Sequence, residues 1–262
     1  MKLGLIDYSN SWPFLRHFRE LDWPGLEIHA DVPSGLNRLL SEGKLDVSAV
    51  SAYECLKAPE DYYILPDWSI NSRRHVRSVM LFSRMPLDDL DHARIGLTSH
   101  SATSIHLLKL LLKGKGFSPE YLNDDAPNLD ARLLIGDPAL TYENSEYPHA
   151  IDLAKEWTQS TGCPMVFAVM AVRRSAKADL RTDLQRLSLE LQQARKTFAK
   201  GLGPLKTEME AQFPNISVDF DEYFSCLDFS FDSECQRGLD TYAKALATHG
   251  FIPPFSSLPI SN

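Results

Sequence analysis

The chain has 262 residues, of which 44% are hydrophobic and 24% charged, so it is too apolar for a disordered chain and fits one large domain or two compact lobes. With 35 acidic residues against 27 Lys and Arg, the formal charge is −8, which argues against a general nucleic-acid binder. The longest apolar run, 165–172, is far shorter than the ~18 residues of a membrane span.

The N-terminus and the cysteines predict a cytoplasmic protein. Asp7 follows closely on Lys2, so the chain starts without the apolar core of a signal peptide. The four cysteines include no C-x-x-C pair, which favours isolated reduced thiols over a metal site or a disulfide framework.

Strand and helix patterns alternate in the first part of the chain. Strands are predicted at 2–7, 26–32 and 45–50, and helices at 13–19, 34–43 and 52–57. Ser34 is a candidate N-cap, and Gly43 marks the end of the same helix. This βαβα order predicts a largely parallel sheet with helices on its faces.

A second α/β series follows two extended segments, 62–70 and 76–83. Strands are predicted at 93–97, 132–135 and 165–173, and helices at 101–113 and 154–159. From Ala176 the chain is mostly helical, with further helices at 221–226 and 233–248. The apolar positions that recur at helical spacing after residue 176 are Leu180, Leu184, Leu187, Leu191 and Ala194.

The simplest assembly of these elements has two α/β lobes. Residues 1–82 and 169–262 would form lobe one, and residues 83–168 would form an inserted lobe two. The segments 76–83 and 165–173 would then be two crossing strands that act as a hinge beside a ligand cleft.

A series of short motifs extends over nearly the whole chain. They are DYSNSWPF at 7–14, VPSGLNRLL at 32–40, LDVSAVS at 45–51, VRSVMLFS at 76–83, LTSHSATS at 97–104, LIGDPAL at 134–140, FAV at 167–169 and YFSCLDF at 223–229. In order and spacing they resemble the MqnA family, the chorismate dehydratases of the futalosine route to menaquinone. The resemblance implies an α/β, two-lobed periplasmic-binding-protein type II fold with a cleft and two crossing strands.

The implied activity is that of a hydro-lyase. Chorismate would lose water to give 3-[(1-carboxyvinyl)oxy]benzoate, by removal of the ring C3 proton and departure of the C4 hydroxyl. The enzyme has to hold both carboxylates, place a base at C3 and donate a hydrogen bond to the leaving hydroxyl. The expected partner is therefore a small dicarboxylate, with no nucleic acid and no membrane.

The resemblance implies that Asn10 and Ser78 are catalytic. Asn10 follows the first strand, at the sheet edge where open parallel sheets bind ligands, and its amide both donates and accepts without titrating. Ser78 lies in a predicted crossing strand, where alternation turns Arg77 to the opposite face. Taken alone, a turn-forming asparagine and a serine in a tight buried position are the alternatives.

A dense group of hydroxyls at 98–104 leads into a leucine-rich helix. Hydroxyls and free N–H groups at a helix start predict an anion-binding site, since ordinary N-capping explains only one of them. Asp137 is interpreted as a cap of the next helix, with a ligand contact as the alternative. The predicted substrate-binding residues are Ser9, Ser51, Thr98, Ser99, Ser101, Ala102, Thr103, Gly136 and Asp137.

No protein base is evident in these motifs. His100 is the best placed candidate, and the alternative is that the enolpyruvyl carboxylate of the substrate takes the proton. The motifs H-E-x-x-H, Walker A, G-x-G-x-x-G and G-x-S-x-G are absent, so we expect no metal and no other cofactor. Trp12 stands where the family usually has a smaller residue, and we expect it to affect the pocket wall.

Three other functions share this fold. A non-catalytic small-anion binding protein would normally carry an export signal. The effector domain of a regulator would normally be attached to a helix-turn-helix. The sibling dihydroxynaphthoate synthase usually opens with a Ser-Pro-Cys-Pro-Asn motif, which this chain lacks. Conversion of chorismate to an aromatic product would separate these alternatives.

Overall fold

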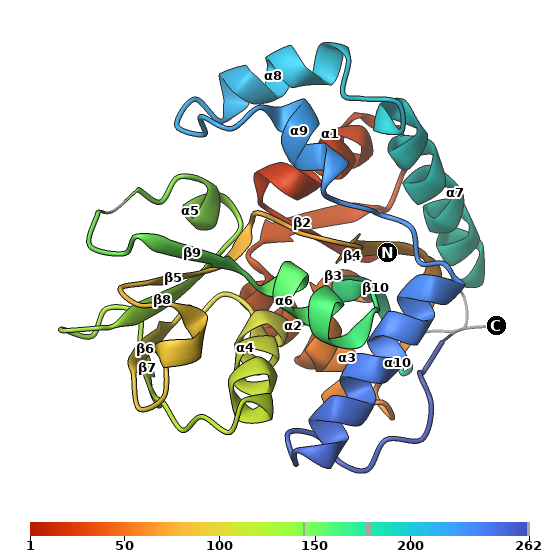
Figure 1. Ribbon diagram of the computed structural model, residues 1–262. Coiled ribbons are helices and arrows are strands. Elements are labelled where there is room, and N and C mark those ends of the chain that lie inside the picture. Colours follow the sequence, from red (N-terminus) through yellow and green to blue (C-terminus); the bar gives the residue numbers. More distant parts are fainter. Residues whose placement is uncertain (144, 177–179, 261–262) are drawn as a thin grey trace.

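A computed structural model describes residues 1–143, 145–176 and 180–260. Two five-stranded sheets form the centres of two lobes, which stand side by side in Figure 1. The strand order is β2-β1-β3-β10-β4 in the first sheet and β7-β6-β8-β5-β9 in the second.

The first sheet contains strands from the parts of the chain before and after the inserted segment. β1 (Lys2–Ile6) lies parallel to β2 (Glu27–Asp31) and β3 (Val47–Ser51), as the βαβα pattern predicts. β10 (Met165–Arg173) runs antiparallel to both β3 and β4 (Tyr62–Ser72), because the chain re-enters this sheet from the side of the second lobe. The sheet is therefore mixed, and the prediction of a largely parallel sheet holds only for its first three strands.

The second sheet is also mixed. β6 (Arg94–Leu97) is parallel to β7 (Glu120–Asn123) and β8 (Ala131–Ile135), whereas β5 (Val79–Ser83) is antiparallel to β8 and β9 (His149–Asp152). The edge strands β7 and β9 have only four residues each, too few for a clear alternation of polar and apolar side chains.

The chain passes between the sheets twice. In the described residues β5 pairs within the second sheet and β10 within the first, although the pairing of β10 with β4 is irregular at two points. The passages are therefore residues 73–78, the first crossing segment, and residues 162–164, the second crossing segment. The chain therefore passes from one sheet to the other a few residues before the expected boundaries at 82 and 168.

Most helices cover the first lobe. They are α1 (Trp12–Glu20), α2 (Pro33–Ser41), α3 (Ala52–Lys57), α7 (Arg181–Phe198), α8 (Pro204–Gln212), α9 (Phe220–Ser225) and α10 (Ser233–Thr248). Val32 is the N-cap of α2, so the expectation that Ser34 caps this helix is wrong, and Pro33 begins it. Gly43 follows the last turn at φ 71°, as predicted.

α7 shows the predicted helical spacing in its buried face. Leu187, Leu191 and Ala194 are buried there, and Leu184 packs against the core. The predicted helical region began at Ala176, but its residues 177–179 lie outside the described residues. In Figure 1 the helix runs along the right-hand edge, and α8 and α9 continue from it over the top of the first lobe.

The second lobe carries α4 (Ala102–Gly114), α5 (Asp137–Leu140), α6 (Leu153–Thr161) and the short 3₁₀ turn η2 (Leu87–Asp89). A second 3₁₀ turn, η1 (Ser9–Ser11), follows β1 in the first lobe. α4 packs against α3 and α10, and one buried apolar cluster extends from the first lobe into the second. The Tyr53 ring stacks on His106 across this contact, with centroids 3.7 Å apart. The two lobes are therefore closed on each other.

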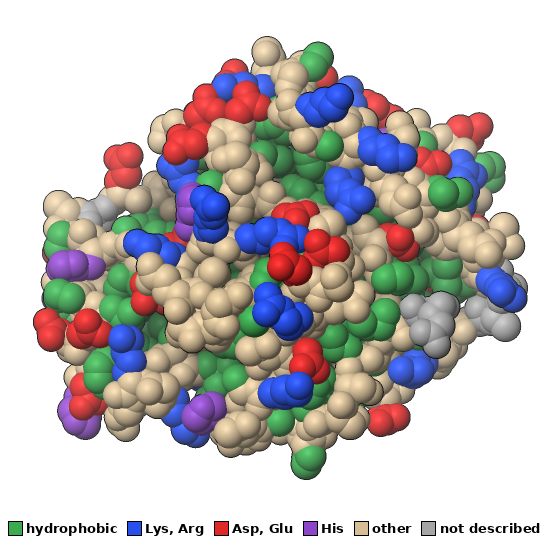
Figure 2. Space-filling view, turned by 45° about the vertical axis from the view of Figure 1, so that its right-hand side comes forward, with side chains coloured by type: hydrophobic (Ala, Val, Ile, Leu, Met, Phe, Trp, Pro, Cys, Tyr) green, Lys and Arg blue, Asp and Glu red, His purple; other side chains and the backbone are tan. Residues whose placement is uncertain are grey.

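Charges of both signs are intermixed on the surface. On the face in Figure 2, Lys and Arg side chains alternate with Asp and Glu side chains. Among the described helices, none has the length and apolar character needed to cross a membrane.

Candidate active site

A cavity lies between the two sheets, beyond the C-terminal ends of β1 and β3. The space inside it that a water molecule can enter is about 50 Å³. Its wall is formed by residues of the first lobe, the second lobe and the first crossing segment, namely Ile6, Tyr8, Asn10, Pro33, Ser51, Ile70, Val76, Ser78, Val79, Ser101, Ser104, Ile135, Gly136, Phe167 and Ala168. A ligand here would contact both lobes, as the hinge arrangement predicts.

The wall is mainly apolar, and its few polar groups are almost all non-ionisable. It carries the amide of Asn10, four serine hydroxyls and the phenol of Tyr8, and the described lining residues include no carboxylate, imidazole or basic side chain. Burial, reinforced by Asp137 and Asp31, raises the pKa of the Tyr8 phenol well above its ordinary value, so this group stays protonated. An anion in this cavity would be held by neutral donors.

Asn10 reaches the cavity from the turn η1, directly after β1. Its side chain is nearly buried, at 8% exposure, and Ser11 Oγ donates a hydrogen bond to Asn10 Oδ1 at 3.1 Å. This contact fixes the oxygen end of the amide. Asn10 thus lies directly after the first strand, as predicted.

Ser78 is the last residue of the first crossing segment and is 2% exposed. Its Oγ donates to the Val76 carbonyl at 3.4 Å, and its own carbonyl accepts the Gly136 N–H at 2.8 Å. Arg77 Nη1 lies 2.8 Å from Glu222 Oε1, away from the cavity. The two neighbouring side chains therefore face different ways, as predicted. The reason is not strand alternation, because β5 begins only at Val79 and Ser78 lies outside the expected strand.

The carboxylate of Asp152 holds this segment in place. Asp152 Oδ2 accepts the N–H groups of Val76 at 2.9 Å and Arg77 at 2.8 Å. Its Oδ1 accepts the N–H groups of Ala154 at 2.9 Å and Lys155 at 3.1 Å, at the start of α6. Arg77 has a φ of 60°, in the left-handed region, and the Asp152 contact stabilises that backbone just before Ser78.

Only two hydroxyls of the 98–104 segment line the cavity, those of Ser101 and Ser104. Ser101 is the N-cap of α4, and its Oγ accepts the Ser104 N–H at 3.3 Å. The oxygen of Thr98 accepts the His100 N–H at 3.2 Å, and that of Thr103 accepts the Tyr53 N–H at 3.1 Å.

The remaining predicted residues of that segment do not line the cavity either: Ser99 is exposed and Ala102 begins α4. In this structure N-capping and contacts with backbone N–H groups therefore engage more of the hydroxyls of this segment than the anion-binding interpretation assumes.

His100 faces Tyr8 instead of the cavity. Its Nδ1 lies 2.9 Å from the Tyr8 hydroxyl, and its carbonyl accepts the Ser34 N–H at 3.1 Å. Since Tyr8 and Ser34 belong to the first lobe and His100 to the second, these contacts link the closed lobes.

Ser9 and Asp137 form another link between the lobes. The Ser9 N–H lies 3.0 and 3.1 Å from the two carboxylate oxygens of Asp137, and Ser9 Oγ donates to Oδ1 at 2.5 Å. The interpretation of Asp137 as a helix cap is wrong, because Gly136 is the N-cap of α5 and Asp137 is its first residue. Burial raises the pKa of Asp137, although the bonds from Ser9 oppose the shift.

Gly136 and Ser51 complete the predicted residues in the wall. Gly136 has a φ of 60°, and a Cβ added there would approach the Tyr8 ring to 2.7 Å, so only glycine fits. The Ser51 hydroxyl is buried and has no hydrogen-bond partner in the described part of the chain. Trp12 does not line the cavity; its ring packs against Phe213 at a centroid distance of 6.4 Å, contrary to expectation.

Sequence reasoning missed Tyr8, Ser104 and Asp152. Tyr8 and Ser104 lay inside the quoted motifs, where neighbouring polar residues received the assignment. Asp152 is visible in the sequence only as a residue before a helix, whereas its contact with Val76 joins residues that are distant in the chain.

The sequence matches the menaquinone biosynthesis family over residues 1–248. It is 36% identical over 277 residues to the chorismate dehydratase of Thermus thermophilus, with 97% of both chains covered. It is 29% identical over 173 residues to the chorismate dehydratase of Campylobacter jejuni, covering 64% of this chain and 66% of that one.

The fold is shared with solute-binding proteins. The periplasmic aliphatic sulphonate binding protein SsuA of Escherichia coli matches with a TM-score of 0.69 and 15% identity, covering 100% of this chain and 92% of that one. The predicted two-lobed periplasmic-binding-protein fold is therefore confirmed. The family match and the similarity to the Thermus protein over the whole length agree with the order of the motifs. The chain belongs to the menaquinone biosynthesis family.

Proposed function

We propose that this enzyme of menaquinone biosynthesis is a hydro-lyase that converts chorismate to 3-[(1-carboxyvinyl)oxy]benzoate and water. The observation that carries the proposal is the cavity wall, which combines the Asn10 amide with serine hydroxyls and has no ionised side chain among its described residues. The name of the Thermus relative supports the choice of substrate.

The proposed reaction uses the substrate as its own base. The enolpyruvyl carboxylate takes the C3 proton, and the electron pair left behind is delocalised toward the ring carboxylate. The pair then expels the C4 hydroxyl group, which takes the same proton back from the enolpyruvyl carboxyl group and leaves as water, while the ring becomes aromatic. Asn10 and Ser78 hold the carboxylate and the leaving hydroxyl by hydrogen bonds in a site shielded from water.

Two features of the wall support substrate-assisted proton removal. No carboxylate or imidazole lies among the cavity residues that the structure describes, and His100 is engaged with Tyr8 behind the wall. Neutral donors do not neutralise the substrate carboxylate, so it keeps its basicity better than it would beside an arginine or lysine.

The activity is tested by incubating the purified protein with chorismate alone. We expect an aromatic product with the mass and NMR spectrum of 3-[(1-carboxyvinyl)oxy]benzoate, unchanged by a chelator. Binding of chorismate without turnover would instead support a small-anion binding protein. Turnover that is lost with a chelator and restored by metal would contradict the prediction that no cofactor is needed. The predicted cytoplasmic location stays a prediction.

The base is tested with His100→Gln, in which the amide can still contact the Tyr8 hydroxyl. If His100 were the base, its loss should lower kcat by ~10²–10⁴. We expect most of the activity to remain, because the substrate supplies the base. A His100→Gln protein that binds chorismate normally but does not turn it over would disprove this mechanism.

A further inference from the structure

Tyr223 of α9 is a fully buried residue with an unused hydroxyl. Its side chain is 0% exposed, and its hydroxyl makes no hydrogen bond of ordinary geometry within residues 1–143, 145–176 and 180–260. A buried hydroxyl without a partner is unfavourable, and phenylalanine would fill the same space without this penalty. The hydroxyl therefore needs an explanation beyond packing.

The hydroxyl lies against two residues of the cavity wall. Burial raises the pKa of Tyr223 well above its ordinary value, whereas the side chains of Ser78 and Asn10 act in the opposite direction. Tyr223 thus stays a neutral phenol, able to donate one hydrogen bond and to accept others. It is not itself part of the cavity wall.

The hydrogen bonds that Asn10 and Ser78 already make determine which further bonds each of them can form with the Tyr223 hydroxyl. Asn10 Oδ1 already accepts from Ser11 Oγ at 3.1 Å, which leaves the amide N–H groups as donors. The Ser78 hydroxyl has one proton to donate, and its Oγ lies 3.4 Å from the Val76 carbonyl oxygen. This hydrogen bond is long, so the hydroxyl can easily turn to a better acceptor.

We propose that Tyr223 is a positioning residue that acts through Asn10 and Ser78. Its hydroxyl accepts from the Asn10 amide and donates to Ser78 Oγ, so that the proton of Ser78 turns into the cavity toward the leaving hydroxyl. This inference rests on the proposed dehydratase function. Hydrogen bonds of this kind are often long without ligand and tighten in the complex, and each bond of such a chain strengthens the next.

The test is Tyr223→Phe, which removes only the hydroxyl. We expect kcat for the conversion of chorismate to fall about tenfold or more with KM little changed, since the lost bond acts mainly on the leaving group. The Tm should stay equal or rise, because an unpaired buried hydroxyl is removed.

Tyr147→Phe is the matched control. Tyr147 is also buried, but its hydroxyl donates to the Leu129 carbonyl at 3.1 Å in the second lobe. The control should lower the Tm and leave kcat unchanged, the opposite of the result expected for Tyr223→Phe.

A double variant tests the route through Ser78. In a Ser78→Ala background, Tyr223→Phe should lower kcat by less than twofold further, because the group that it orients is gone. Wild-type kcat in Tyr223→Phe, a lowered Tm with it, or a full additional loss in the double variant would each overturn the inference. A wild-type protein that makes no aromatic product would overturn the proposed function as well, whereas an active wild type with an equally active Tyr223→Phe overturns the inference alone.

Discussion

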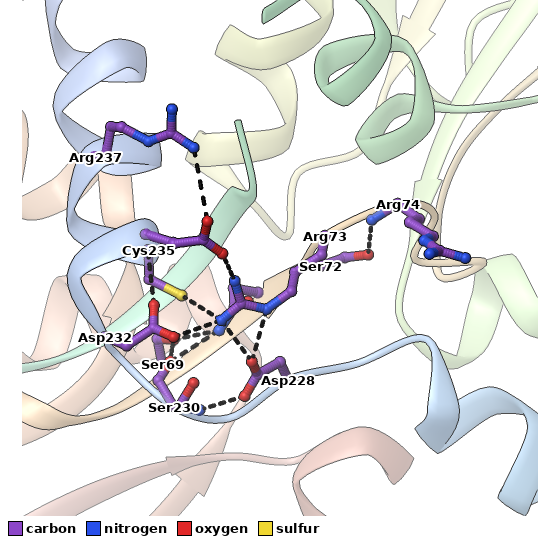
Figure 3. A network of polar contacts seen from close by, with 11 residues as sticks. Ser69, Ser72, Arg73, Arg74, Asp228, Ser230, Asp232, Cys235 and Arg237 are labelled. Carbon is purple, nitrogen blue, oxygen red and sulfur yellow. Dashed lines mark hydrogen bonds and ion pairs between the residues drawn. The ribbon is translucent and has the colours of Figure 1, made fainter. Parts of the chain in front are cut away.

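Two segments cross between the same two lobes, and different kinds of contact hold them. The first crossing segment is fixed by charged groups: Asp152 accepts two of its N–H groups, and Arg73 at its start contacts three carboxylates (Figure 3). The second crossing segment begins at Gly162, which ends α6 at φ 67°, and it packs through Pro164 against Gly238 of α10.

The difference follows from what each segment has to position. The first ends at Ser78 in the cavity wall, and directed hydrogen bonds fix the orientation of a backbone as well as its place. The second leads directly into β10, which is buried up to its last residue, Arg173, so close packing is sufficient. We therefore infer that changes in the first segment alter the site, whereas changes in the second alter mainly stability.

The largest effect is expected from Asp152→Ala. It leaves the N–H groups of Val76 and Arg77 without their acceptor and removes the N-cap of α6. We expect a loss of roughly 3–6 kcal/mol in the free energy of unfolding, measured by urea denaturation, since each of the two lost bonds to the charged acceptor contributes ~1.5–3 kcal/mol.

Asp152→Asn is the matched variant, because it retains the shape and one acceptor oxygen. It should unfold at an intermediate urea concentration and should still lose activity, since the backbone before Ser78 is held less firmly. Full activity in a folded Asp152→Asn protein would contradict the link between this carboxylate and the site.

Ser78→Ala should lower activity without unfolding the protein. A hydrogen bond to a charged or developing charge is worth roughly 1.5–3 kcal/mol, so kcat/KM for chorismate should fall about 10–150-fold. Ser83→Ala is the control in the same lobe, because its buried hydroxyl accepts the Met85 N–H at 3.1 Å outside the cavity. Equal kinetics of the two variants would remove Ser78 from the proposed site.

Gly238→Ala tests the second crossing segment. A Cβ at this position would come within 2.3 Å of the Pro164 carbonyl oxygen, which belongs to the backbone and cannot rotate away. We expect a loss of about 1–3 kcal/mol in the free energy of unfolding, typical of overpacking, while kcat stays within twofold of the wild type. A variant that is stable but inactive would show that this segment also orients the site.

The first crossing segment also shows where sequence-based prediction stops. The position of Asn10 can be predicted from local pattern, because a polar residue that follows an apolar strand lies at the sheet edge. The support of Ser78 cannot be predicted in this way. Asp152, which accepts the N–H groups of Val76 and Arg77, ends an edge strand that is too short to recognise.

The hydroxyls at 98–104 give the same lesson in another form. Their density is visible in the sequence, but the direction of each depends on the phase of α4 and on distant partners. The Thr103 hydroxyl, for example, accepts a hydrogen bond from the Tyr53 N–H, whereas Ser104 faces the cavity. Composition therefore predicts a polar site here, while the structure decides which hydroxyls a ligand can reach.

The smallest effect is expected at the exposed start of the first crossing segment. Arg73 Nη2 lies 2.7 Å from Asp232 and 3.1 Å from Asp228, and Arg73 Nη1 contacts Glu234 (Figure 3). The side chain is 35% exposed, so solvent and salt screen these pairs. Arg73→Gln should lower the free energy of unfolding by about 0.5–1 kcal/mol at low salt, less at high salt, with unchanged kcat.

The pH dependence of that difference follows from Asp232. Burial raises the pKa of its carboxyl, but the Cys235 N–H and the Arg73 guanidinium outweigh burial, so the pKa is lowered overall. A lowered pKa in the folded state stabilises the protein above the unfolded value and is lost as the pH falls through the folded one. The difference in unfolding free energy between wild type and Arg73→Gln should therefore shrink below about pH 4. Arg237→Gln is the control, because Arg237 lies 3.9 Å from Glu234 at 60% exposure and should show no measurable difference at any pH. A difference for Arg73→Gln that persists undiminished at acid pH would mean that this residue stabilises the segment by packing, as in the second crossing segment, and not by charge.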